Sequence, residues 1–245
     1  MSDASLHYAQ NSRINQIAGN VSVNPYEFSR WSAAGAAQLK LIFEEIEETI
    51  AAAKAGNFKE LRDGLADSIV TLDGFFHRLE LTYPEQVWLK SEVDQYSGIT
   101  PQGVENLLMG GWRVLDTTFY SITTLDEYVN QHEYLTKTAS YLLVQLYAVA
   151  KQYNVPVQDD QDAVYTSNLS KFDTDYVSAV ESLARYVEQN VCATLERSVV
   201  DGERYFILKV MEDSVNTQGK FFPAGKFLKS QNFKEPVFQD LGSVA

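Results

Sequence analysis

The sequence predicts a mainly α-helical fold with a small strand-containing region near the C-terminus. Apolar residues recur at helical spacing through two long stretches in the first third of the chain. By contrast, residues 203–210 alternate in the period-two pattern of a strand. Hydrophobic residues make up 45% of the 245 residues and aromatic residues 12%, which is enough to fill a substantial core.

The first of these stretches predicts a helix over residues 24–55. Asn24-Pro25-Tyr26-Glu27 is typical of a helix start, with Asn as the cap, Pro in the first turn and Glu closing a capping box. Gly56 suits the C-terminal stop, and Asn57 opens a second helix over residues 57–79. Because the turn between them is short, the two helices should pack antiparallel.

Beyond this pair, residues 82–126 are predicted to be an insertion of short helices and loops. Further helices are expected over 125–154 and 173–191, followed by a C-terminal extension over 192–245 that holds the strand. We predict one domain over 1–245, made of an acidic helical pair (24–81), the insertion, the remaining helices (127–191) and the extension. The residues that interrupt the helical pattern in the insertion are Pro84, Gly98, Pro101, Gly103, Gly110 and Gly111.

The charge balance restricts the partners of the chain. A net charge of −13 argues against general binding to nucleic acid or to anionic lipid, since a phosphate backbone demands clustered Lys and Arg. It permits a free nucleotide, because metal ions can carry positive charge to the phosphates. Cys192 is the only cysteine, and no stretch is apolar enough for a membrane span. We therefore expect a cytoplasmic protein with no membrane partner.

Carboxylates gather on one face of each acidic helix. Glu44, Glu45 and Glu48 share a face of the first helix, and Asp63 and Asp67 lie one turn apart on the second. An antiparallel pair joined at the Gly56 turn brings these five side chains level with one another. Hard oxygen donors at one level suit Mg²⁺ or Mn²⁺. The pattern thus predicts a metal site.

The alternative is a solvated acidic face with salt bridges, and spacing alone leaves the two readings equally open. One argument against a plain surface is that small apolar residues continue the acidic face in both directions, so we expect the first helix to be covered on both sides. Arg62 lies outside the acidic face and is expected to be a surface residue of little consequence. The apolar residues in question are Ala34, Ala37, Leu41, Ala51, Ala52 and Ala55.

Four segments in order resemble the all-α nucleoside triphosphate pyrophosphohydrolases, the MazG-like and phosphoribosyl-ATP pyrophosphohydrolase-like group, in their phage form. Glu44-Glu45-Ile46-Glu47-Glu48 matches the Glu-Glu-x-x-Glu helix, and Asp63-Gly64-Leu65-Ala66-Asp67 matches Asp-x-Leu-Ala-Asp. Ser167-Asn168-Leu169-Ser170-Lys171 is similar to Ser-Asn-Met-Ser-Lys, and the stretch from Gly225 to Pro236 is similar to the Gly-Lys…Lys…Pro tail.

The chain departs from that group at one site position. Many members carry Glu-x-x-Asp on the second helix, whereas Gly64 stands three residues before Asp67 here, so Asp63 or Glu60 would have to replace that glutamate. A long segment also separates the acidic pair from the Ser-Asn-x-Ser-Lys stretch.

The resemblance implies a four-helix-bundle-like core and a Mg²⁺-dependent, or Mn²⁺-dependent, hydrolase that releases pyrophosphate from a (deoxy)nucleoside triphosphate. It implies metal binding by the five carboxylates, with Glu45 or Glu48 as the catalytic base, and a homodimer or homotetramer in the cytoplasm, of the host if the chain is phage-encoded. The alternatives are a related hydrolase of a nucleoside diphosphate or alarmone, and a non-catalytic acidic interaction protein. The residues that it assigns to the substrate are Asn168, Lys171, Lys226 and Lys229.

Overall fold

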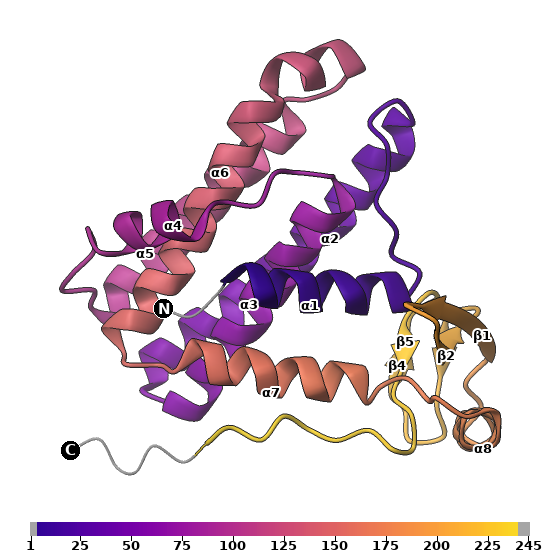
Figure 1. Ribbon diagram of the computed structural model, residues 1–245. Coiled ribbons are helices and arrows are strands. Elements are labelled where there is room, and N and C mark those ends of the chain that lie inside the picture. The colour runs from indigo at the N-terminus through magenta and orange to yellow at the C-terminus, as the bar shows by residue number, and fades with distance from the viewer. Residues whose placement is uncertain (1–3, 240–245) are drawn as a thin grey trace. The chain divides into compact units, whose positions relative to one another are not determined.

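The computed structural model describes residues 4–239, so residues 1–3 and 240–245, the two ends of the predicted domain, lie outside the described part. The fold is mainly helical with a small antiparallel sheet near the C-terminus, as predicted (Figure 1). The chain divides into two compact units, and each is described below by itself. Of the described residues, the first comprises 4–12, 21–162 and 238–239, and the second comprises 13–20 and 163–237. No helix between residues 4 and 239 is long and apolar enough to cross a membrane.

The described helices follow the predicted order, with two additions that the sequence pattern did not indicate, α1 and α7. Both helices have only a weak apolar periodicity, which is the main signal that predicts a helix from sequence. The helices are α1 (Ala4–Ile17), α2 (Phe28–Ala55), α3 (Phe58–Arg78), α4 (Gln86–Val93), α5 (Pro101–Tyr120), α6 (Leu125–Gln152), α7 (Val157–Leu169) and α8 (Tyr176–Val187).

The hairpin of α2 and α3 forms as its capping residues predict. Gly56 ends α2 in the left-handed conformation, with φ of 65°, which a glycine adopts without steric cost. Asn57 caps α3 by accepting a hydrogen bond from the backbone N–H of Glu60. The start of α2 differs, because Asn24 accepts from the backbone N–H of Tyr26 in a preceding turn, and the helix begins at Phe28.

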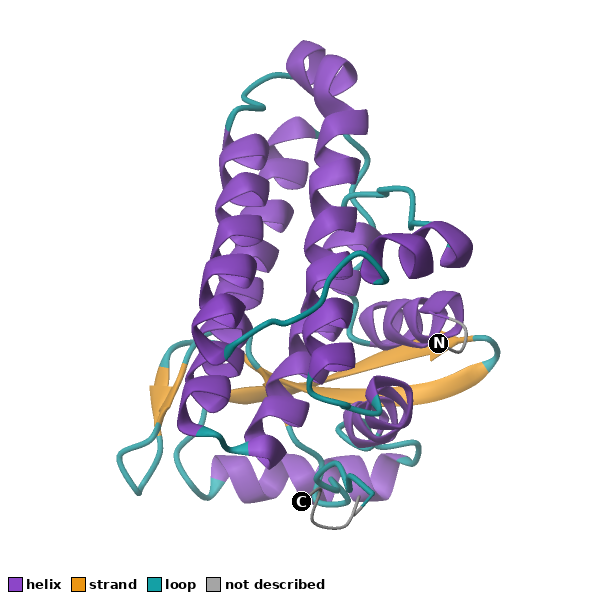
Figure 2. Cartoon of the chain, turned by 90° about the vertical axis from the view of Figure 1, so that its left-hand side faces the viewer, coloured by secondary structure: helices purple, strands orange, loops and turns teal. Residues whose placement is uncertain are grey.

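The first unit contains a bundle in which α2 packs on α3 and α5, and α6 packs on α3 and α5. Figure 2 shows the long helices of this unit running side by side. The bundle is thus completed within one chain, by a helix from the segment that we predicted to be an insertion of short helices and loops. That prediction is wrong for α5, which continues through Gly103, Gly110 and Gly111.

The physical reason lies in close packing at Gly111. A Cβ atom at this position would come within 1.9 Å of the side-chain Oε1 of Gln145 and 3.2 Å of Leu142 on α6. The glycine therefore allows α5 and α6 to approach and does not mark a loop. Thr100 accepts a hydrogen bond from the backbone N–H of Gly103, and Pro101 occupies the first turn, so the start of this helix carried a readable signal.

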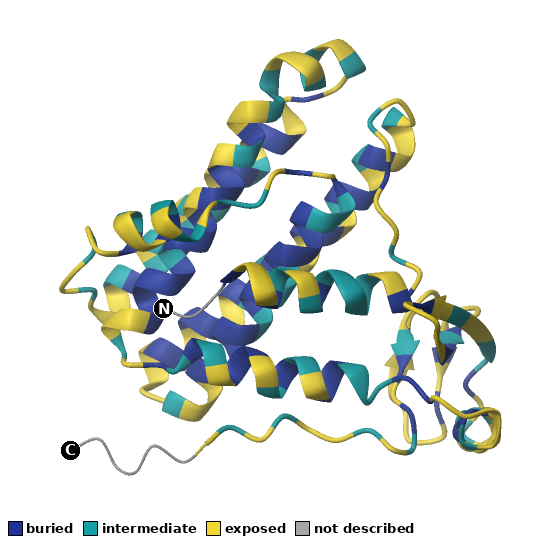
Figure 3. Ribbon diagram, in the orientation of Figure 1, coloured by how far each residue is buried: buried dark blue, intermediate teal, exposed yellow. Residues whose placement is uncertain are grey.

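Burial on α2 is one-sided, in disagreement with the prediction that the helix is covered on both faces (Figure 3). Ala34 and Ala52 are buried, but Leu41 is 43% exposed. The remaining predicted positions, Ala37, Ala51 and Ala55, are exposed. The core side instead carries Trp31, Leu39, Ile42, Ile46 and Ile50, because these residues face the other bundle helices.

The second unit holds the sheet. Strand β2 (Glu203–Val210) coincides with the predicted strand and pairs antiparallel with β1 (Ala193–Val200) on one side and β5 (Phe227–Leu228) on the other. Strands β3 (Ser214–Val215) and β4 (Phe221–Phe222) form a separate two-stranded ladder. Helix α8 packs against β1 and β2, and buried residues of β2 such as Leu208 join the apolar clusters of this unit.

A carboxyl group lies in the core of the first unit. Asp73 on α3 is fully buried, and its Oδ2 accepts a hydrogen bond from Asn11 Nδ2 at 2.8 Å. Burial raises the pKa of Asp73 from its usual 3.8 to about 7, although hydrogen bonds from Asn11 and Tyr83 oppose the shift. The buried acid is therefore protonated in the folded chain at pH values where it is ionised in the unfolded chain.

This carboxyl makes the stability of the chain depend on pH. Between about pH 4 and pH 7 the folded state binds the extra proton, so the contribution of Asp73 falls as pH rises, by at most about 1.4 kcal/mol per pH unit. Asp73→Asn should remove this dependence, because the amide does not ionise. Urea unfolding of both proteins at about pH 5 and about pH 7.5 measures it. If the free energy of unfolding falls equally between these two pH values in the wild type and in the variant, Asp73 is not the source of the pH dependence.

Candidate metal and catalytic site

The five predicted carboxylates all belong to the first unit and lie on the paired helices α2 and α3. Glu44 and Glu48 are exposed, whereas Glu45, Asp63 and Asp67 are partly buried. The arrangement follows from the antiparallel hairpin, in which the end of α2 faces the beginning of α3.

Glu45 lies at the centre of this acidic cluster. Burial raises its pKa from 4.5 to about 7, and the negative charges of Asp67, Glu48, Asp63 and Glu44 contribute in that order. All four other members of the cluster thus lie close enough to oppose ionisation of Glu45. The structure brings together the five residues that the sequence pattern grouped.

Small residues beneath the cluster allow the two helices to approach. A Cβ atom at Gly64 would lie 2.7 Å from Thr49 Oγ1 and 3.1 Å from its Cα. Thr49 Oγ1 also lies 3.2 Å from Ser68 Oγ and donates to the backbone carbonyl of Glu45. A larger side chain at position 64 would therefore push α3 away from α2, which explains the glycine at this position.

The chemistry of the donors fits a hard divalent cation, but the carboxylates do not converge on one point. Within residues 4–239, no three His, Cys, Asp or Glu side chains are arranged as a closed metal site. Glu44 pairs with Lys40, whose Nζ lies 3.7 Å from its carboxylate. Clustered negative charges repel one another, and a cation between them would relieve the repulsion that raises the pKa of Glu45.

A groove of about 610 Å³ lies between α2 and α5 in the same unit. Its cationic side chains are Lys54, which pairs with Glu105 at 2.8 Å, and Arg113. Glu47 and Ala51, from the exposed side of α2, also line it. Sequence reasoning did not single out this groove, because it depends on α5 being a bundle helix.

The residues assigned to the substrate by resemblance belong to the second unit. Asn168 is buried in the last turn of α7, and its Oδ1 accepts a hydrogen bond from Lys171 Nζ at 2.5 Å. Lys226 is exposed in the turn before β5, and its backbone carbonyl accepts from Val210. Lys229 is exposed and pairs with Glu235 at 3.0 Å.

The structure brings the two motif segments of the second unit side by side. The backbone N–H of Ser230 donates to the carbonyl of Lys171, and that of Lys234 donates to Ser170 Oγ. Both segments are held by Asp173, which is buried and whose Oδ1 accepts from Ser230 Oγ and Asn232 Nδ2. Sequence reasoning missed Asp173, although it lies only two residues after the Ser-Asn-Leu-Ser-Lys stretch.

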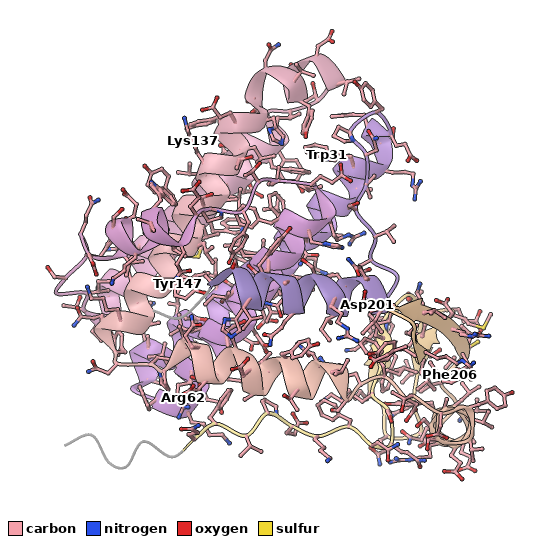
Figure 4. All side chains as sticks on the ribbon, viewed as in Figure 1. Trp31, Arg62, Lys137, Tyr147, Asp201 and Phe206 are labelled. Atoms are coloured by element: carbon pink, nitrogen blue, oxygen red, sulfur yellow. The ribbon has the colours of Figure 1, made fainter. Side chains whose placement is uncertain are left out.

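One expected surface residue is instead buried. Arg62 on α3 donates from Nε and Nη2 to the two carboxylate oxygens of Asp160, at 2.9 and 2.5 Å, and from Nη1 to the carbonyl of Gln239 (Figure 4). Both members of this ion pair are buried. The prediction that Arg62 is a surface residue of little consequence is therefore wrong, because Asp160 of α7 and the carbonyl of Gln239 supply its partners.

Comparisons of the chain with protein-family models, with curated proteins and with solved structures gave no significant match.

Proposed function

We propose that the chain is a divalent-metal-dependent hydrolase that converts a (deoxy)nucleoside triphosphate to the monophosphate and pyrophosphate. The observation that supports this function best is the position of Glu45, which is partly buried and affected by four further carboxylates from two helices. An ordinary acidic surface spreads its charges into solvent, whereas this one concentrates them. The type of reaction is proposed from the four motifs that resemble, in the same order, those of the all-α nucleoside triphosphate pyrophosphohydrolases.

In this proposal Glu44, Glu45, Glu48, Asp63 and Asp67 would hold Mg²⁺ or Mn²⁺. The bound metal would supply positive charge to the phosphates and lower the pKa of a water molecule. Glu45 or Glu48 would accept the proton of the attacking water, and the partly buried carboxylate of Glu45 is suited to that role. The α-phosphorus is attacked and the bond to the bridging oxygen breaks, so pyrophosphate leaves with that oxygen.

The resemblance also assigns Asn168, Lys171, Lys226 and Lys229 to substrate binding. It further implies that the protein forms a homo-oligomer and works in the cytoplasm. We include these points in the proposal. The exposed apolar positions beside the acidic cluster, such as Leu41 and Ala51, are consistent with a second copy covering this face of α2.

A non-catalytic acidic interaction protein is the second candidate. The open arrangement of the carboxylates and the exposure of Glu44 and Glu48 favour it. A hydrolase of nucleoside diphosphates or alarmones would share the chemistry of the first candidate.

Product analysis separates these candidates. With Mg²⁺ and a panel of nucleoside triphosphates, we expect equal amounts of monophosphate and pyrophosphate, and no turnover in excess chelator. These products are expected because attack at the α-phosphorus breaks its bond to the oxygen that bridges the α- and β-phosphates. Products are resolved by ion-exchange chromatography, with a coupled assay for pyrophosphate. Release of orthophosphate as the first product, or full activity with chelator, would exclude the proposed reaction.

A further inference from the structure

The β1–β2 hairpin of the second unit presents two arginines on one face. In its register Arg197 lies opposite Phe206, and Val199 lies opposite Arg204. Because side chains alternate between faces and paired residues share one, Arg197 and Arg204 are diagonal neighbours on the same face. Both are exposed.

Two adjoining hollows, of about 510 and 350 Å³, are each lined by both arginines. These volumes fall within the range of small-molecule sites, which is roughly 300–1,000 Å³. Tyr176, at the start of α8, lines the smaller hollow and is 63% exposed. The rings of Tyr176 and Phe206 form an edge-to-face contact, with centroids 5.8 Å apart, so the tyrosine is held beside the sheet.

The carboxylates that line these hollows are paired with other cations. Glu203 accepts from Arg13 Nη2 and from the Tyr205 hydroxyl, each at 2.5 Å. Glu196 lies 3.9 Å from Lys209. In the part of the chain that the structure describes, Arg197 and Arg204 form no ion pair with a carboxylate within 4.0 Å. Two uncompensated guanidinium groups thus face solvent together in a chain of net charge −13.

An anion with a planar aromatic part matches this surface. Guanidinium groups bind phosphate through paired, charge-assisted hydrogen bonds, and an exposed tyrosine ring stacks on a nucleobase. We propose that Arg197, Arg204 and Tyr176 bind a nucleoside phosphate without a metal, the phosphate on the two guanidinium groups and the base against the tyrosine. This site is distinct from the acidic cluster, and its ligand is either a free nucleotide or a nucleotide within a single strand.

Calorimetric titration of the full chain in EDTA tests the site, because the acidic cluster needs a divalent cation to hold a phosphate. The probes are a nucleoside monophosphate, inorganic phosphate, the nucleoside alone and a short single-stranded oligonucleotide. We expect the monophosphate to bind at least about tenfold more tightly than phosphate or nucleoside. An oligonucleotide that binds more tightly than the monophosphate assigns the site to a strand, and one that binds less tightly assigns it to the free nucleotide.

The variants identify the residues. Arg197→Gln and Arg204→Gln should each weaken monophosphate binding by about ten- to a hundredfold, the usual effect of losing a charge-assisted hydrogen bond. Tyr176→Ser should weaken the monophosphate but leave inorganic phosphate unchanged. Arg185→Gln, which changes an exposed arginine of α8 outside both hollows, is the control and should bind as the wild type does.

Three results would overturn the proposal. The first is an absence of monophosphate binding in EDTA, and the second is equal affinity for the monophosphate and for inorganic phosphate. The third is an equal loss of monophosphate affinity in Arg185→Gln and Arg204→Gln. None of them bears on hydrolysis, which requires the metal and is measured separately.

Discussion

Glu45→Gln should remove nearly all hydrolytic activity and leave the chain folded. If Glu45 accepts the proton of the attacking water, the amide cannot replace it, and loss of a general base costs roughly 10²–10⁴-fold in rate. Glu48→Gln and Asp67→Asn should have comparable effects, through the same role or through metal binding. The measurement is kcat/KM for pyrophosphate release at saturating Mg²⁺.

The stability of the same variant provides a second readout. Burial and four neighbouring carboxylates oppose the charge of Glu45, so Glu45→Gln should melt at the same or a higher temperature than the wild type in EDTA. Glu133→Gln removes an exposed carboxylate of α6 and serves as the matched control. If Glu45→Gln and Glu133→Gln hydrolyse substrate equally well, the acidic cluster is a surface feature and the interaction-protein candidate is favoured.

Arg62→Met should destabilise the first unit strongly. The substitution leaves the buried carboxylate of Asp160 without its two charge-assisted hydrogen bonds, and breaking a buried ion pair from one side costs about 3–5 kcal/mol. Contacts of the guanidinium group with the rings of Phe58 and Phe238 would also be lost. Urea unfolding followed by far-ultraviolet circular dichroism gives the free energy of unfolding.

Two further variants test the cause of this loss. Arg62→Met combined with Asp160→Leu should recover a large part of the stability, because the double variant buries no unpaired charge. Arg30→Met removes an exposed arginine of α2 that pairs with Glu27 and should change stability by no more than about 0.5 kcal/mol. A loss in Arg62→Met as small as in Arg30→Met would show that the ion pair does not hold α7 against α3.

The electrostatics of α3 illustrate how one helix combines separate tasks. Asp63 and Asp67 join the acidic cluster with α2, Arg62 forms the buried pair with Asp160, and Asp73 in the core is protonated below about pH 7. These three sets of ionisable groups affect stability differently. The carboxylates of the cluster repel one another, the opposite charges of the ion pair compensate each other, and Asp73 is uncharged when it binds a proton. Only the repulsion of the cluster would be relieved by a cation.

Local signals in the sequence were sufficient for the elements that depend on neighbours in the chain. Gly56, the Asn57 cap and the apolar stripe of α3 predicted the helical hairpin, and the alternation within residues 203–210 predicted β2. The same spacing grouped the carboxylates around Glu45, because the register of an antiparallel pair follows from its short turn. These features arise within about one helical turn or one strand, where residue type limits the backbone directly.

Tertiary structure decided the rest. Gly111 looked like a helix breaker, but it lies where α6 passes too closely for a side chain, and nothing near it in the sequence reports that contact. Arg62 looked like a surface residue until Asp160, far along the chain, provided its partner. Leu41 and Ala51 looked like a second buried face and are exposed, since periodicity shows that a face is apolar but not what covers it. Helix spacing thus determined which residues share a face in this protein, and only the packing of distant segments decided which of those faces are buried.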